Sequence, residues 1–228
     1  MSACADGTSW KEEVLLHDGK KIIVERSQTY GGRHEIGQKP PIKEQKLTFT
    51  LPGSNQSITW KSDYSEDIGR VNLNPLALHI LNGTPYIVAE PNLCLAYNKW
   101  GRPNPPYVFF KHDGKTWQRI AMSEFPARLK DINLVVNTLG EAGTLGSAKV
   151  ISADTARELN SQLWRYPNEQ IQYKTILREA MKVHPDSIVS CEVMVRITEG
   201  WGKGGWRSPD GPKAPIPIGP AISSETTK

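Results

Sequence analysis

Four short turn signals separate strand-like apolar segments within the first half of the chain. Each signal is a residue pair that contains glycine, and such pairs are typical of the tight turns between antiparallel strands. They fall at Asp18-Gly19, Pro52-Gly53, Asn82-Gly83 and Asp113-Gly114. Strands joined at such short intervals favour an antiparallel meander, sandwich or barrel over a parallel α/β sheet. The sequence therefore predicts a mainly β fold.

The pattern changes after Asn137, where two helices are expected. Ser152 is a good N-cap for a helix over residues 152–164, in which apolar residues recur at helical spacing. A second amphipathic pattern predicts a helix over residues 169–183, which ends before Pro185. With the preceding strands, these two helices near the C-terminus predict an α+β fold overall.

The composition is typical of one globular domain with an extension at each end. Of the 228 residues, 38% are hydrophobic and 23% are charged, which is close to the globular average. Residues 1–12 are expected to form an N-terminal tether, and residues 13–199 a single mostly β domain. Residues 200–228 are expected to form a Gly/Pro-rich loop and a disordered tail. The net charge of +4 is too small to predict a nucleic-acid partner.

The first four residues predict a lipid anchor. The order Met1-Ser2-Ala3-Cys4 matches the pattern at which bacterial lipoprotein signal peptides are cleaved, with methionine in the place of the usual leucine. In that pattern the cysteine carries the lipid, so we expect lipidation at Cys4 and a signal peptide before it. An ordinary cytosolic start is the alternative interpretation, because four residues form a short motif.

The other two cysteines, Cys94 and Cys191, have two interpretations. If Cys4 carries a lipid, they are an even pair that an oxidising periplasm could join in a disulfide. Alternatively they are two buried free thiols, because cysteine is often a small core residue. The sequence has no Cys-x-x-Cys motif and no Cys/His cluster, so no metal site is predicted.

Longer motifs accompany the N-terminal pattern. They are Trp-Lys-Glu-Glu at 10–13, Gly-Gly-Arg-His-Glu-Ile-Gly-Gln at 31–38, the Pro-rich run at 97–106 and Tyr-Lys-Thr-Ile-Leu-Arg-Glu-Ala at 173–180. With Cys4, these runs resemble a group of uncharacterised proteobacterial lipoproteins over most of the chain. The resemblance implies a signal peptide and a cell-envelope location. It implies no activity for any residue.

Aromatic and basic residues gather in three Gly/Pro-rich segments, residues 31–41, 98–106 and 200–211, which predicts a recognition surface. Tryptophan offers a flat face to sugar rings or cations, and arginine offers a fork for carboxylate or phosphate. An anionic glycan, peptidoglycan or lipid head groups would suit such loops in an envelope protein. In the structural alternative, Trp100 covers a sheet edge and Arg102 caps carbonyl groups. The predicted binding residues are Arg33, His34, Trp100, Arg102, Trp201, Trp206 and Arg207.

Three functional hypotheses follow. The sequence lacks a nucleophile elbow, a phosphate-binding loop, a dinucleotide-binding glycine motif and a His-Glu-x-x-His motif, so no cofactor is predicted. The favoured hypothesis is a non-enzymatic, lipid-anchored periplasmic protein at the outer membrane, with a binding or structural role. The second is a periplasmic hydrolase or transferase that acts on an envelope glycan through His34 and Glu35. The third is an accessory subunit of an envelope complex.

Overall fold

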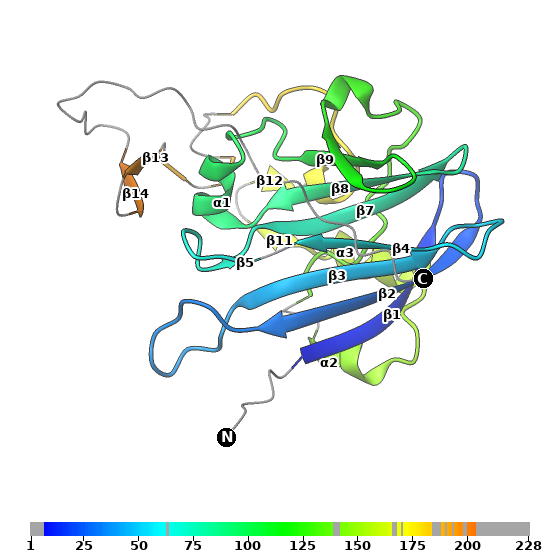
Figure 1. The fold of residues 1–228 in the computed structure, drawn as a ribbon, viewed down its shortest axis with the longest axis horizontal. Helices are drawn as coiled ribbons and strands as arrows, with labels where there is room; N and C mark the ends of the chain where they lie inside the picture. Colours follow the sequence, from blue (N-terminus) through cyan, green and yellow to red (C-terminus); the bar gives the residue numbers. More distant parts are fainter. Residues whose placement is uncertain are drawn as a thin grey trace.

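The computed structural model is mainly β, with two four-stranded antiparallel sheets and short helices (Figure 1). This architecture confirms the predicted fold class. The structure describes residues 7–62, 64–138, 142–165, 168–169, 171–183, 188–189, 191–192, 194–197 and 200–203.

Each four-stranded sheet is a meander in which consecutive strands are neighbours, so all four predicted hairpins are confirmed. The first sheet consists of β1 (Gly7–Leu15), β2 (Lys21–Tyr30), β3 (Ile42–Thr50) and β4 (Ser57–Ser62). The second consists of β7 (Leu73–Leu81), β8 (Thr84–Pro91), β9 (Val108–His112) and β10 (Trp117–Ile120).

The remaining elements are short. Two-residue strands β5 (Tyr64–Ser65) and β6 (Arg70–Val71) form a hairpin between the sheets in the sequence. The C-terminal strand pairs are β11 (Trp164–Arg165) with β12 (Asn168–Glu169) and β13 (Met194–Ile197) with β14 (Gly200–Lys203). The helices are α1 (Leu93–Lys99), α2 (Ala142–Ser147) and α3 (Ala153–Ser161).

The turn between β7 and β8 shows why a residue pair can determine a hairpin. Asn82 has a φ of 51° and Gly83 a φ of 75°. Two successive positive φ values are required by the hairpin turn whose twist matches that of the strands, and Asn-Gly is the pair that adopts them at least cost. The local sequence therefore fixes this turn before any tertiary contact forms.

The two sheets share one hydrophobic core. Alternate side chains of β1–β4 point to the inner face, where Leu47 and Trp60 are fully buried. They pack in one cluster with Leu78, Ile87 and Phe110 of the second sheet. The ring centroids of Trp60 and Phe110 lie 6.0 Å apart. The alternation in the sequence thus creates the face on which the second sheet packs.

The second sheet is buried on its other face as well. There Leu76, Val88 and Phe109 pack against Phe125 and Ile176 from the segments that follow the sheet. A strand buried on both faces needs apolar residues at consecutive positions. This requirement explains why β7 is buried at every position from Pro75 to Ile80, with His79 as the polar exception, whereas burial alternates along the strands of the first sheet.

One of the two predicted helices is confirmed and the other is wrong. The Ser152 hydroxyl accepts from the backbone N–H of Thr155 and caps α3, which ends at Ser161. Among the described residues of the segment 169–183, Glu169 ends β12, Ile171–Tyr173 form a 3-10 turn, and residues 174–183 are non-helical. The backbone N–H of Ile176 donates to the Lys130 carbonyl at 2.8 Å. Pairing with a neighbouring segment replaces the internal hydrogen bonds that a helix would make there.

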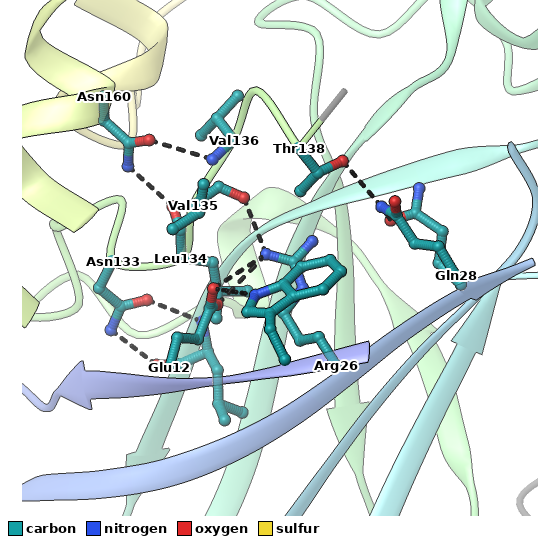
Figure 2. Close-up of polar contacts among 12 residues, drawn as sticks. Glu12, Arg26, Gln28, Asn133, Leu134, Val135, Val136, Thr138 and Asn160 are labelled. Atoms are coloured by element: carbon teal, nitrogen blue, oxygen red, sulfur yellow. Dashed lines mark hydrogen bonds and ion pairs between the residues drawn. The ribbon is translucent and has the colours of Figure 1, made fainter. Parts of the chain in front are cut away.

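A buried polar network joins the segment 133–138 to both sheets (Figure 2). The Arg26 guanidinium donates to the carbonyl of Val135 and also forms an ion pair with the carboxylate of Glu12. Asn133 donates to the carbonyls of Leu15 and Leu78, which belong to different sheets. Buried polar groups must find partners, so this segment holds the edges of the two sheets together.

Helix α3 is tied to the same segment by one side chain. The Asn160 amide donates to the carbonyl of Leu134, and its oxygen accepts from the backbone N–H of Val136 (Figure 2). A single buried asparagine thus satisfies both groups of an extended backbone. The network places the helix against β1, where Trp10 and Ile151 share a small apolar cluster.

Candidate functional site

The connection between β2 and β3, residues 31–41, carries the catalytic candidates His34 and Glu35. Both side chains are exposed. Nδ1 of His34 donates to the carbonyl of Gly32 at 2.8 Å, and Glu35 accepts from Gln38 at 3.5 Å. Both residues therefore bond within their own loop. Neither residue lines one of the two surface cavities that are described below.

The hairpin β5–β6 packs against this loop. The backbone N–H of Arg33 donates to the carbonyl of Gly69 at 3.0 Å, and its guanidinium donates to the carbonyl of Glu66 at 3.1 Å. At Gly32, which has a φ of +94°, a Cβ would lie 2.5 Å from the Gly69 oxygen. Glycine is required at this position because the backbones of the loop and the hairpin approach so closely.

The same hairpin also binds the end of α1. Nζ of Lys99 lies 3.1 Å from Oδ1 of Asp67 and 3.1 Å from the Ser65 hydroxyl. Two of the predicted recognition segments, 31–41 and 98–106, thus flank one hairpin at one end of the molecule. The sequence motifs for these segments are far apart in the chain, and no local pattern predicts that they meet.

Trp100 lies in the core rather than on the surface. Only 7% of it is exposed, and its ring centroid lies 6.3 Å from that of Phe110 in an edge-on arrangement. The guanidinium of Arg119 stacks 5.3 Å from the centre of its ring. Trp100 therefore packs against the second sheet, as in the alternative interpretation of the sequence in which it covers a sheet edge.

Arg102 contacts the backbone of residues 191 and 192 in the C-terminal part of the chain. Its guanidinium donates to the carbonyls of Cys191 and Glu192 at 3.0 and 3.1 Å, and it lies 4.9 Å from the centre of the Tyr97 ring. The sequence alternative in which Arg102 caps carbonyl groups is the one found. The aromatic and basic pattern of residues 98–106 thus serves a contact within the chain.

Asn104 makes a second contact of the same kind. Its amide donates to the carbonyl of Met181 at 3.1 Å, and its oxygen accepts from the Met181 backbone N–H at 2.7 Å. Only an asparagine or glutamine side chain can present a donor and an acceptor in this way. The Pro-rich loop therefore holds residues 181 and 191 by side-chain contacts to their backbone.

A disulfide completes the attachment of the C-terminal segment. Cys94 in α1 and Cys191 are bonded, with 5.1 Å between their Cα atoms and a sequence separation of 97. The Asn98 amide donates to the carbonyl of Cys94 at 3.0 Å. Of the two interpretations left open by the sequence, the structure has the bonded pair.

The structure does not describe the side chains of the remaining predicted site residues. Trp201 belongs to β14, of which the backbone alone is described. Trp206, Arg207 and Cys4 lie outside the described residues.

Two cavities open on the described surface. The smaller, of about 180 Å³, is lined by residues that include Pro103, Arg119 and Met122. Partial burial lowers the pKa of the Arg119 guanidinium, which remains a cation because arginine titrates so far above neutrality. The larger, of about 370 Å³, is lined by Leu15, Asp131, Ile132, Asn133, Ala153, Arg157, Asn160, Ser161, Tyr173 and Lys174. Its walls carry charges of both signs.

Comparison with protein-family models, with curated proteins and with solved structures found no match for this chain. The resemblance to envelope lipoproteins therefore stays a prediction. Among the described residues, no helix is long and apolar enough to cross a membrane, and no group of three or more His, Cys, Asp or Glu side chains is arranged to hold a metal ion.

Proposed function

We propose that this protein is a non-enzymatic binding protein of the bacterial cell envelope, held at a membrane by a lipid on Cys4. The Cys94–Cys191 disulfide carries the proposal. Disulfides form and persist in the periplasm and in other oxidising compartments, and they are rare in the bacterial cytosol. The lipoprotein-like order of residues 1–4 predicts the same compartment from a different part of the chain.

A binding role is favoured by the cationic loop 31–41. Arg33 and Lys39 are exposed on it, and the hairpin β5–β6 holds the backbone of Arg33 in a defined position. Cations on a preformed loop favour an anionic partner because little ordering is needed on binding. The anionic components of the envelope, such as lipid head groups and acidic glycans, fit this chemistry.

The enzymatic alternative receives no comparable support. A general acid or base must lie within hydrogen-bond reach of a bound substrate. His34 and Glu35 are exposed and bond to groups of their own loop, so we do not assign them a catalytic role.

Fractionation of a proteobacterial host that expresses the gene tests the proposal. The wild-type protein is expected in the membrane fraction, from which detergent but not salt releases it. A Cys4→Ser variant that follows a signal peptide cleaved without lipidation is expected in the soluble periplasmic extract, with Cys94 and Cys191 protected from alkylation by their disulfide. A control with serine at both positions 94 and 191 should remain at the membrane. A wild-type protein in the cytosol with two reactive thiols would contradict the proposal.

A further inference from the structure

The N-terminus of the described chain lies beside the base of loop 31–41. In the first sheet Gly7 pairs with Thr29, and the loop begins two residues after Thr29. Figure 1 shows the start of β1 and this loop at the same end of the molecule. Gly7 is three positions after Cys4 in the chain, and three residue steps span at most about 10 Å. A lipid on Cys4 would therefore hold this end of the sheet close to the membrane.

We propose that loop 31–41 is a second membrane contact, which binds anionic lipid head groups and places Ile36 at the bilayer interface. The inference rests on the proposed lipid anchor for its orientation. It adds a surface and a partner: an anionic bilayer, bound through the loop itself.

The tip of the loop presents an apolar side chain to solvent. The backbone N–H of Gln38 donates to the carbonyl of Glu35 at 3.1 Å, and Gly37 has a φ of +86°. These features define a tight turn with glycine at its third position. Ile36 is the second residue of that turn and is fully exposed. Transfer of a large aliphatic side chain out of water is favourable. The interface of a bilayer offers an apolar environment that Ile36 could reach.

Basic residues surround the apolar tip. Residues 31–43 contain three cations, Arg33, Lys39 and Lys43, against the single carboxylate of Glu35, so their net charge is +2 with histidine neutral. Nζ of Lys43 lies 5.6 Å from the centre of the Tyr64 ring, which holds this cation beside the loop. Cations next to an apolar residue are typical of segments that bind an anionic membrane surface.

The loop is preformed at its base. The backbone N–H of Gly31 donates to the carbonyl of Pro41 at 2.9 Å, and that of Arg33 donates to Gly69 at 3.0 Å. A preformed loop loses little conformational entropy on binding. A weak contact of this kind is sufficient when a lipid already keeps the domain at the membrane, because the second contact is then intramolecular in effect.

Vesicle sedimentation tests the loop independently of the lipid anchor. The full chain with Cys4→Ser is mixed with vesicles of phosphatidylcholine, or of equal parts phosphatidylcholine and phosphatidylglycerol. We expect clear preference for the anionic vesicles. In the same chain, Arg33→Gln and Lys39→Gln should each weaken binding about five-fold, and Ile36→Asn about ten-fold.

Matched variants at other exposed positions serve as controls. Ile23→Asn removes an exposed isoleucine from β2, and Lys20→Gln removes a cation from the turn at the opposite end of the sheet. Both should bind as the parent chain does. Equal binding to the two kinds of vesicle, or an unchanged affinity of the Ile36→Asn variant, would overturn the inference. Binding to a soluble acidic polysaccharide without binding to vesicles would also overturn it, in favour of a glycan partner.

A fluorescence measurement separates failure of the loop from failure of the anchor. An environment-sensitive dye is attached to the lipidated protein through Ile36→Cys, or through Asn55→Cys in the exposed turn between β3 and β4. On anionic vesicles, blue-shifted emission is expected at position 36 and not at position 55. If Cys4 carries a lipid and position 36 shows no shift, the loop inference is wrong and the proposed function stands.

Discussion

Glu12 and Arg26 form a buried ion pair, with 3.2 Å between Oε1 and Nη1 and at most 2% of either side chain exposed. Each partner has a further bond. The Trp10 indole donates to Glu12 at 2.9 Å, and Arg26 donates to the carbonyl of Val135 at 2.8 Å. The pair thus joins adjacent strands of the first sheet to the segment that crosses to the second sheet.

Removal of one partner should be more damaging than removal of both. We expect Arg26→Met to lower the free energy of unfolding by about 3 to 5 kcal/mol, because it leaves the Glu12 carboxylate buried without its cation. The double variant with Glu12→Gln should be less destabilised than the sum of the single variants. Urea unfolding of all four proteins gives this coupling, and strict additivity would show that the pair does not act as a unit.

The disulfide should provide a large part of the stability. Replacement of both Cys94 and Cys191 by serine is expected to lower the free energy of unfolding by about 4 to 5 kcal/mol, because the bond closes a loop of nearly a hundred residues in the unfolded chain. Reduction of the wild-type protein with dithiothreitol should give the same shift in urea midpoint. Cys4→Ser is the control and should have the wild-type midpoint. An equal midpoint for the double-serine protein would rule out this contribution.

Asn104 should slow the hydrogen exchange of backbone amides near residue 181. In Asn104→Asp the carboxylate can still accept from Met181 N–H, but it cannot donate to the Met181 carbonyl. We expect a local loss of about 1 to 2 kcal/mol, seen as faster hydrogen exchange of amides near residue 181. Amides in β3 should exchange at the wild-type rate. Unchanged exchange near residue 181 would mean that other contacts hold this segment.

Stability should fall as the solution is acidified below neutral pH. His79 is fully buried and its Nε2–H donates to the carbonyl of Asp131, and burial lowers its pKa from the ordinary value of 6.5. Below about that pH the unfolded chain therefore binds a proton that the folded chain does not, and unfolding becomes more favourable. Burial likewise lowers the pKa of His112.

Unfolding in urea at a series of pH values measures this effect. The free energy of unfolding of the wild-type protein should decrease as the pH falls from 7.5 towards 5. The His79→Gln variant should have a shallower decrease, with the remaining slope due partly to His112. A variant with the full wild-type slope would show that His79 is not the titrating group.

The hairpins could be predicted because their determinants are local. Asn82-Gly83 and Asp18-Gly19 prescribe tight turns whatever the surrounding chain does, and alternation in β3 identifies its buried face. The Ser152 cap of α3 is local in the same sense. These features depend on neighbours within a few residues, which a single sequence displays.

The errors arise where distant segments determine the outcome. Residues 169–183 have helical periodicity, but Ile176 is buried against the second sheet and its backbone pairs with residue 130. A polar row on the inner face of the first sheet, including Arg26 and Gln28, has partners that lie more than 100 residues away. Arg102 likewise depends on a distant partner, since its guanidinium donates to the carbonyl of Cys191, 89 positions further along the chain.

Mass spectrometry of the N-terminal peptide can show whether this protein is a lipid-anchored envelope protein. The protein is produced in a proteobacterial host from its own gene and extracted with detergent. We expect a mature chain that begins at Cys4, with a diacylglyceryl group on the sulfur and a fatty acyl chain on the amino group. A peptide that retains residues 1–4 with an unmodified Cys4 would contradict it.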